Sequence, residues 1–286
     1  NGRRRCYRAT AGKCIGEKRT EQRRRDKLFD DVITGLITEE EFFNIAEESG
    51  WPLKQPPVVC CLVAFKPTES QLKWLQTDCE EWQAWIDTAI DMLLARLGVV
   101  TYQVDQGIVI LQNPSNKASD RSVNDIRVWA AKVSHVIKDV FRTIDYMVGV
   151  STADTEIRTV YKQAYEAVKV GPIFHPEKSI HFWDDLGVCR LLIDQAKSKA
   201  GIAFIRDYLG PLLESSPRNT EWLMTLQEFV SGDTMTEMAA RLHIHPKTLV
   251  FRRRKIEKLL QTDLDDPEQR LNIAIALKLK QLREKL

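Results

Sequence analysis

An uninterrupted run of eight apolar residues, from Val58 to Phe65, places the strongest limit on the fold of this chain. Pro67 ends the run shortly afterwards. A continuous apolar stretch of this length is typical of a β-strand that is buried on both faces. Because each face of such a strand must be covered, we expect a sheet packed between helices.

Helix and strand patterns alternate around that run. Apolar residues at helical spacing predict helices over residues 21–36, 39–48, 70–97, 122–141 and 155–170. Further strands are predicted at 99–104, 108–112, 146–151 and 180–183, with a hairpin turn at 105–107. From Gly187 onward every apolar pattern is helical. We therefore predict an α+β fold, in which a mixed α/β sandwich is followed by an all-α C-terminal domain.

The domain boundaries follow from these patterns and from the length of 286 residues, which suits two domains. Residues 1–20 lack apolar periodicity and are predicted to be a basic linker or the truncated end of something larger. Residues 21–57 are predicted to be a helical linker, residues 58–186 the α/β domain and residues 187–286 the helical domain.

The cysteines and the hydropathy argue against several classes of protein. The six cysteines form no C-x-x-C pair, the histidines lack zinc spacing, and Cys60 and Cys61 lie within the apolar run. We therefore expect core thiols, a reducing cytoplasmic location, and neither a metal nor another cofactor. No window approaches 18 apolar residues, so we expect no membrane partner.

The charges are distributed unevenly although the net charge is only +2. Residues 1–27 contain eleven Lys or Arg against three acids, and residues 236–286 contain twelve against seven. The residues between contain nineteen against thirty and are acidic. Basic ends on an acidic body indicate a localised site for a polyanion, of which nucleic acid is the usual example.

A helix-turn-helix is predicted at about residues 234–260. Thr234 and Glu237 have the spacing of a capping box, which begins a helix at Met235. After a short turn, His245 is positioned to cap a second helix, and Pro246 suits its first position because the missing N–H is not needed there. Two helices joined by so short a turn form a helix-turn-helix.

The second helix of this motif has an apolar face and a cationic face. On a helical wheel, Ile256, Leu259 and Leu260 cluster near Leu249, and cationic side chains lie opposite. We predict that base edges are contacted by His245, Lys247, Thr248 and Phe251, and phosphates mostly by Arg252, Arg253, Arg254 and Lys255, with Lys258 on the same cationic face. The alternative is a solvated charged face that binds no DNA.

These C-terminal residues resemble the helix-turn-helix of PucR/CdaR-type regulators. The resemblance rests on His-Pro-Lys-Thr-Leu-Val-Phe-Arg at 245–252 and on segments 256–257, 264–271 and 276–277, with further matches at 184–187, 208–213 and 223–226. Gly-Val-Ser at 149–151 and Tyr-Lys-Gln-Ala-Tyr-Glu-Ala at 161–167 resemble the GGDEF-like domain that precedes it. The resemblance implies a transcription activator or dual regulator of a metabolic operon, with a degenerate GGDEF-like domain.

The chain departs from the family pattern at three positions of the motif. Lys247 replaces the usual Asn, which affects base preference, and Gln261 replaces a common Gly at the helix end. Arg253 replaces the usual Leu and falls inside the apolar stripe, so it either snorkels or the helix packs differently. The family also carries an upstream sensor domain, which is not visible in this sequence.

A catalytic role for the middle domain is not supported by its hairpin. A diguanylate cyclase carries Gly-Gly-(Asp/Glu)-Glu-Phe there, whereas this chain has Val-Asp-Gln-Gly-Ile at 104–108. Metal-assisted phosphoryl transfer needs clustered oxygen ligands, and a lone Asp105 is more simply a turn residue. We therefore predict a protein that is not an enzyme and has no catalytic residues.

Three hypotheses follow from the sequence. The first is a DNA-binding regulator that binds double-stranded operator DNA as a homodimer or higher homo-oligomer, with a small-molecule effector left open. The second is a nucleotide-binding or diguanylate-cyclase-like protein. The third is a dimerising protein-interaction module that does not bind DNA.

Overall fold

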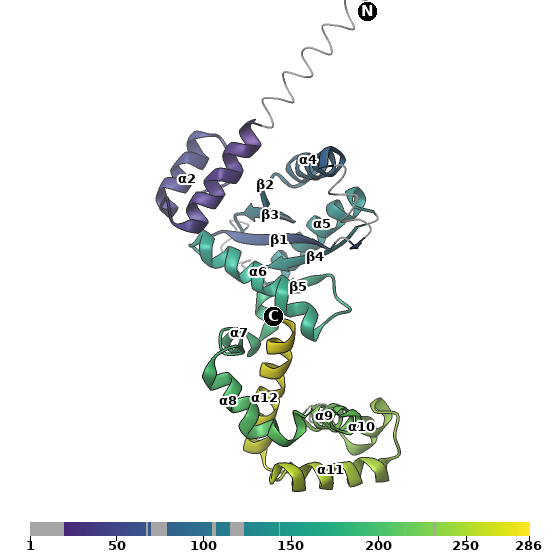
Figure 1. Cartoon of the computed structure of the whole chain (residues 1–286). Coiled ribbons are helices and arrows are strands. Elements are labelled where there is room, and N and C mark those ends of the chain that lie inside the picture. The colour runs from purple at the N-terminus through teal and green to yellow at the C-terminus, as the bar shows by residue number, and fades with distance from the viewer. Residues whose placement is uncertain are drawn as a thin grey trace, which may run out of the picture. The chain divides into compact units, whose positions relative to one another are not determined.

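The computed structural model describes residues 20–286 except 67, 70–78, 105–106, 115–122, 143, 215 and 231–232. It divides into two compact units, the first ending at Leu186 and the second running from Gly187 to Leu286. The first unit contains one five-stranded sheet and the second is helical, as the sequence predicted (Figure 1).

The sheet of the first unit has the strand order β2-β3-β1-β4-β5. Its strands are β1 (Val59–Lys66), β2 (Val100–Val104), β3 (Gly107–Gln112), β4 (Asp145–Val150) and β5 (Ile180–Phe182). The apolar run forms the central strand β1, which is antiparallel to β3 and β4, whereas β4 and β5 are parallel. The predicted mixed pairing is therefore confirmed.

Helices cover both faces of the sheet (Figure 1). Alternate residues of β1, such as Cys61 and Val63, pack in one core with α4 (Cys79–Leu97) and α5 (Val123–Val140). The intervening residues, such as Cys60 and Leu62, pack in a second core with a helix over residues 20–34, α2 (Glu39–Glu48) and α6 (Ile157–Phe174). This alternation explains why the run contains no polar residue.

Several predicted element bounds were wrong in detail. Gly107 is not a turn residue but the first residue of β3, where it pairs with Val104 and Ala64. Trp183 begins a short 3-10 helix (Trp183–Leu186) rather than ending a strand. Helix α6 continues to Phe174 through Pro172, because its earlier turns bury a continuous face against the sheet.

The tryptophans and cysteines of this unit fall where packing was expected. Trp82 and Trp85 pack against the core beneath α4, whereas Trp74 lies outside the described residues. Cys60 and Cys61 are fully buried free thiols, and burial raises the pKa of both well above the usual range. These two cysteines are core residues rather than reactive groups.

The helix over residues 20–34 covers the edge strand β2. The side chain of Gln22 donates from Nε2 to the carbonyl oxygen of Thr101 (3.2 Å), and Asp26 Oδ1 accepts from the backbone N–H of Gln103 (2.8 Å). Open strand edges invite pairing with other chains, and side chains that occupy their backbone groups prevent it. The N-terminal helix therefore belongs to the sheet unit and protects its edge.

Asp26 is predicted to make the stability of this unit pH-dependent. Burial raises the pKa of Asp26 despite opposing hydrogen bonds from Gln103 and Gln22. A raised folded-state pKa means that the stabilisation is fully present below the unfolded-state pKa and is lost as the pH rises through the folded-state pKa. Asp26→Asn keeps an acceptor oxygen for Gln103 without the charge, so it should melt a few degrees above the wild type at pH 7. Thermal unfolding at pH 7 and pH 4 should show that advantage shrinking with acid; an advantage that grows with acid would contradict the assignment.

The second unit consists of helices that pack around α12. Its elements are α7 (Cys189–Leu192), α8 (Lys199–Leu209), a 3-10 turn (Gly210–Leu212), α9 (Pro217–Val230), α10 (Met235–Arg241), α11 (Pro246–Leu260) and α12 (Pro267–Lys285). Helix α12 packs against α8 and α9, and α11 packs against α9 and α10. Buried residues of α12, such as Ile273 and Leu277, supply much of the core. Among the described helices, none is long and apolar enough to span a membrane.

Candidate nucleic-acid interface

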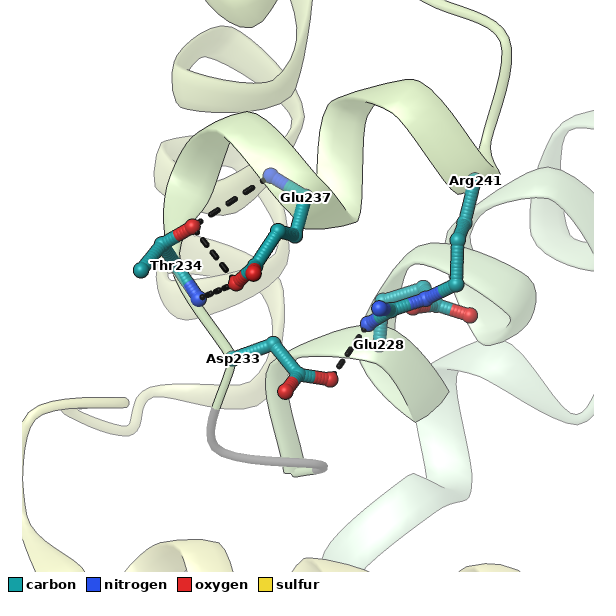
Figure 2. A network of polar contacts seen from close by, with 5 residues as sticks. All are labelled: Glu228, Asp233, Thr234, Glu237 and Arg241. Carbon is teal, nitrogen blue, oxygen red and sulfur yellow. Dashed lines mark hydrogen bonds and ion pairs between the residues drawn. The ribbon is translucent and has the colours of Figure 1, made fainter.

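The first helix of the C-terminal motif, α10, begins with the predicted capping box. Thr234 Oγ1 accepts from the backbone N–H of Glu237 (3.4 Å), and Glu237 Oε2 accepts from the backbone N–H of Thr234 (3.0 Å) (Figure 2). Hydrogen bonds from Thr234 lower the pKa of Glu237. The capping box therefore satisfies donors at the start of α10 and fixes where the motif begins.

The far end of α10 is tied to α9 by Arg241. Its Nε lies 2.6 Å from Glu228 Oε2, and its Nη2 lies 2.6 Å from Asp233 Oδ2 (Figure 2). Glu228 belongs to α9 and Asp233 precedes the cap, so a single guanidinium joins three parts of the motif. The sequence analysis missed this contact, because Arg241 and Glu228 are 13 residues apart and no helical spacing links them.

The turn between α10 and α11 is short and tightly defined. His243 adopts a left-handed backbone conformation with φ 52°. His245 has extended backbone angles, and its Nδ1 accepts from the backbone N–H of Lys247 (3.1 Å), as an N-cap residue does. Pro246 is the first residue of α11. Local geometry thus bears out the roles predicted for His245 and Pro246 in starting this helix.

Helix α11 has the two faces predicted by the helical wheel. Leu249 and Ile256 are fully buried in the helical unit, and Leu259 and Leu260 are half-buried. The opposite face is exposed and cationic, with Phe251 at its centre at 59% exposure. The exposed residues of this face are Lys247, Thr248, Phe251, Arg254, Lys255 and Lys258, which we call the cationic face.

An aromatic side chain within the cationic face is held beside a cation. The Nζ of Lys255 lies 5.5 Å from the centre of the Phe251 ring. An exposed phenylalanine gains nothing from burial in this unit, but its ring can contact apolar groups such as the thymine methyl in the major groove. The arrangement suits a surface that contacts both phosphates and base edges.

Two of the predicted phosphate contacts, Arg252 and Arg253, lie elsewhere on the helix. Both are half-buried, and both are engaged within the protein by acidic residues. The structure therefore brings together six of the nine predicted contact residues on one exposed face, places His245 at its N-terminal end, and sets these two arginines apart.

The end of α11 has a left-handed residue that is not glycine. Gln261 is the C-cap, with φ 51° and ψ 43°, and its N–H donates to the carbonyl oxygen of Glu257. This conformation suits glycine, which lacks the Cβ that crowds the neighbouring carbonyl. The departure from the family pattern at this position therefore leaves a strained helix end.

Gln261→Gly is expected to stabilise the helical unit by about 0.5–1 kcal/mol, which is the relief of left-handed strain less the entropy of an added glycine. Chemical denaturation would measure this change. Gln261→Ala, which keeps the Cβ, is the matched control and should give no gain. Equal stability of the two variants would show that the backbone at residue 261 is not strained.

The sheet unit presents one cavity near the ends of its parallel strands. It has a volume of about 270 Å³ and is lined by residues that follow β4 and β5, including Thr152 and Asp184. At its wall, Arg127 pairs with Asp185 and lies 4.2 Å from the centre of the Phe182 ring. Ligands of α/β sheets bind outside the carboxyl ends of strands, so this is a candidate ligand site.

No metal centre emerges from the part of the chain that the structure describes, where no three His, Cys, Asp or Glu side chains form a group that could hold an ion. Asp105, at the hairpin tip, lies outside that part. The comparison with the GGDEF-like domain stays a prediction for this unit.

The family comparison identifies the C-terminal motif. Residues 222–279 match the model of the PucR C-terminal helix-turn-helix domain. The predicted resemblance is confirmed over this segment, which spans α10, α11 and parts of α9 and α12.

Two curated proteins are similar to longer stretches of the chain. The DNA-binding transcriptional activator AdeR of Bacillus subtilis (strain 168) is 24% identical over 221 residues, which are 75% of this chain and 48% of AdeR. The transcriptional activator PmfR of Paenarthrobacter nicotinovorans is 29% identical over 130 residues, which are 45% of this chain and 27% of PmfR. The matched regions thus span less than half the length of either relative.

A solved structure also aligns with the chain. It is a regulator of polyketide synthase expression from Bifidobacterium adolescentis, with 14% sequence identity and a TM-score of 0.37 over 91% of this chain and 93% of that one.

Proposed function

We propose that this chain, which has a C-terminal helix-turn-helix of the PucR type, is a sequence-specific DNA-binding transcriptional regulator. The observation that carries the proposal is the exposed cationic face of α11 on a capped helix-turn-helix. Phosphate neutralisation by Lys and Arg supplies much of the affinity of such surfaces for DNA.

In the proposed complex, α11 lies in the major groove. The first residues of a recognition helix point at base edges, so Lys247, Thr248 and Phe251 are the proposed base contacts, with His245 at the helix start. Lysine donates to guanine O6 and N7, and the Phe251 ring suits the thymine methyl. Arg254, Lys255 and Lys258 are the proposed phosphate contacts, since they continue the exposed face towards the helix end.

The more detailed proposal is an activator of a metabolic operon that acts in the cytoplasm without catalysis. Its support is that both curated relatives carry the name of transcriptional activators. We further propose a homodimer or higher homo-oligomer that binds a pseudo-palindromic operator, with half-sites about one helical turn apart. Sedimentation of the chain with and without operator DNA would measure that oligomeric state.

Fluorescence anisotropy with DNA from upstream of the gene and its neighbours tests the proposal. We expect the upstream duplex to bind at least about 10³-fold more tightly than random duplex, with an affinity that falls steeply between 50 and 200 mM salt. Weak binding that is equal for both duplexes would contradict the proposal and favour an interaction module. Turnover of GTP with Mg²⁺ would instead favour the cyclase hypothesis.

A further inference from the structure

The geometry points to Arg252 and Arg253 as positioning residues that fix the rotation of α11, rather than as DNA contacts. This inference rests on the proposed function, because it concerns which side chains of α11 face the groove. It divides the basic run at 252–255 into two pairs with different roles.

Arg252 joins α11 to α9. Its Nη2 lies 2.6 Å from Glu221 Oε2, and its Nη1 lies 3.3 Å from the hydroxyl oxygen of Thr225. Thr225 is fully buried, and its hydroxyl donates to the carbonyl oxygen of Glu221 (2.8 Å). The Arg252 side chain is only 18% exposed, so it packs against α9 along most of its length.

Arg253 joins α11 to the segment that follows it. Its Nε lies 2.9 Å from Glu257 Oε1 and its Nη2 lies 2.7 Å from Asp265 Oδ2. Its guanidinium also lies 5.8 Å from the centre of the Phe229 ring of α9. Glu257 in turn accepts from the backbone N–H of Leu264 (3.3 Å), which fixes the turn after α11. The pKa of Arg253 is raised, with the hydrogen bond to Asp265 as the largest cause.

The two arginines bracket the buried face of α11. At about 100° per residue, Arg252 falls on one side of the stripe formed by Leu249 and Ile256, and Arg253 falls on the other. An apolar stripe alone tolerates small rotations of a helix, because the hydrophobic effect is not directional. Directed guanidinium contacts on both sides resist rotation in either sense, which keeps Lys247 and Arg254 on the exposed face.

A charge exchange across the α9–α11 contact tests the role of Arg252. Arg252→Glu alone is expected to lower the unfolding midpoint of the helical unit by about 5 °C and to weaken operator binding about 10-fold or more. Adding Glu221→Arg restores the pair with opposite polarity, so both properties should return most of the way to wild type. A phosphate contact at residue 252 would not be restored by a change in α9, and failure of the exchange would overturn the inference.

The salt dependence of DNA binding separates the two pairs of cations. Arg253→Met and Arg254→Met are matched variants, one at each kind of position. Each lost phosphate contact should lower the slope of log K against log salt by about 0.9. We expect that loss for Arg254→Met, with an unchanged unfolding midpoint. Arg253→Met should keep the wild-type slope and lower the midpoint; a lowered slope at an unchanged midpoint would overturn the inference.

The two proposals fail in distinguishable ways. If the wild-type chain shows no preference for any duplex, the proposed regulatory function fails. The unfolding midpoints of the exchange variants then still show whether Arg252 couples α11 to α9, since that measurement needs no DNA.

Discussion

Replacement of Lys247 and Arg254 by alanine is expected to weaken operator binding by about 10²–10³-fold at physiological salt. One bidentate base contact is worth about 1–3 kcal/mol, and each phosphate contact adds a further salt-dependent contribution. Both side chains are exposed on the cationic face of α11, at its start and middle. Fluorescence anisotropy at two salt concentrations would measure the affinity, and the slope of log K against log salt should fall by about 1–2.

The control for this variant removes two equally exposed cations from another helix of the same unit. Lys199 and Arg206 lie on α8, and their double alanine variant changes the net charge by the same amount. We expect it to change operator affinity by less than about 3-fold, because rim charges far from a contact act only through screened electrostatics. Equal losses in both variants would mean that α11 contributes only general charge, and that its basic face is a solvated surface.

Gly149→Ala is expected to destabilise the sheet unit by about 3 kcal/mol or more. Gly149 lies in β4, where it pairs with Leu62 of β1 and His181 of β5. A Cβ at this position would lie 2.0 Å from the carbonyl oxygen of Ala164 and 2.9 Å from the backbone nitrogen of Val168. These are backbone atoms of α6, so the clash is relieved only if the helix lifts from the sheet and opens the core.

Chemical denaturation followed by tryptophan fluorescence would measure the effect, with the two units analysed as separate transitions. Gly210→Ala is the matched control, since a Cβ there meets only Arg206 Cγ at 3.9 Å in a helical conformation. Its stability should remain within about 1 kcal/mol of wild type. A Gly149→Ala variant that unfolds like the wild type would show that α6 does not lie as close to β4 as described.

The sequence by itself determined those features whose cause lies within a few residues. The apolar run at 58–65 specified a central strand, because every side chain of such a strand is buried. The capping box of Thr234 and Glu237 and the Pro246 that follows His245 specified where α10 and α11 begin. The helical wheel also specified the buried face of α11, since its period is a property of the helix alone.

Small residues in the sheet unit show how a local pattern acquires its reason from packing. The sequence placed Gly149 in a strand and Ala164 in a helix as parts of a resemblance, with no physical cause for either. The close approach of α6 to β4 supplies that cause, since larger side chains would separate the two elements. The same approach extends α6 to Phe174, beyond the end that its apolar pattern predicted.

Only the tertiary structure decided which of the four cations at 252–255 are engaged within the protein. Their sequence is Arg-Arg-Arg-Lys, and nothing local separates them. The distinction comes from Glu221, which precedes Arg252 by 31 residues, and from Asp265 in the segment after α11. The cover of β2 by Gln22 and Asp26 likewise joins residues 77 to 79 positions apart. Periodicity and caps report interactions within a turn or two of chain, whereas these contacts exist only once the core has brought distant helices and strands together.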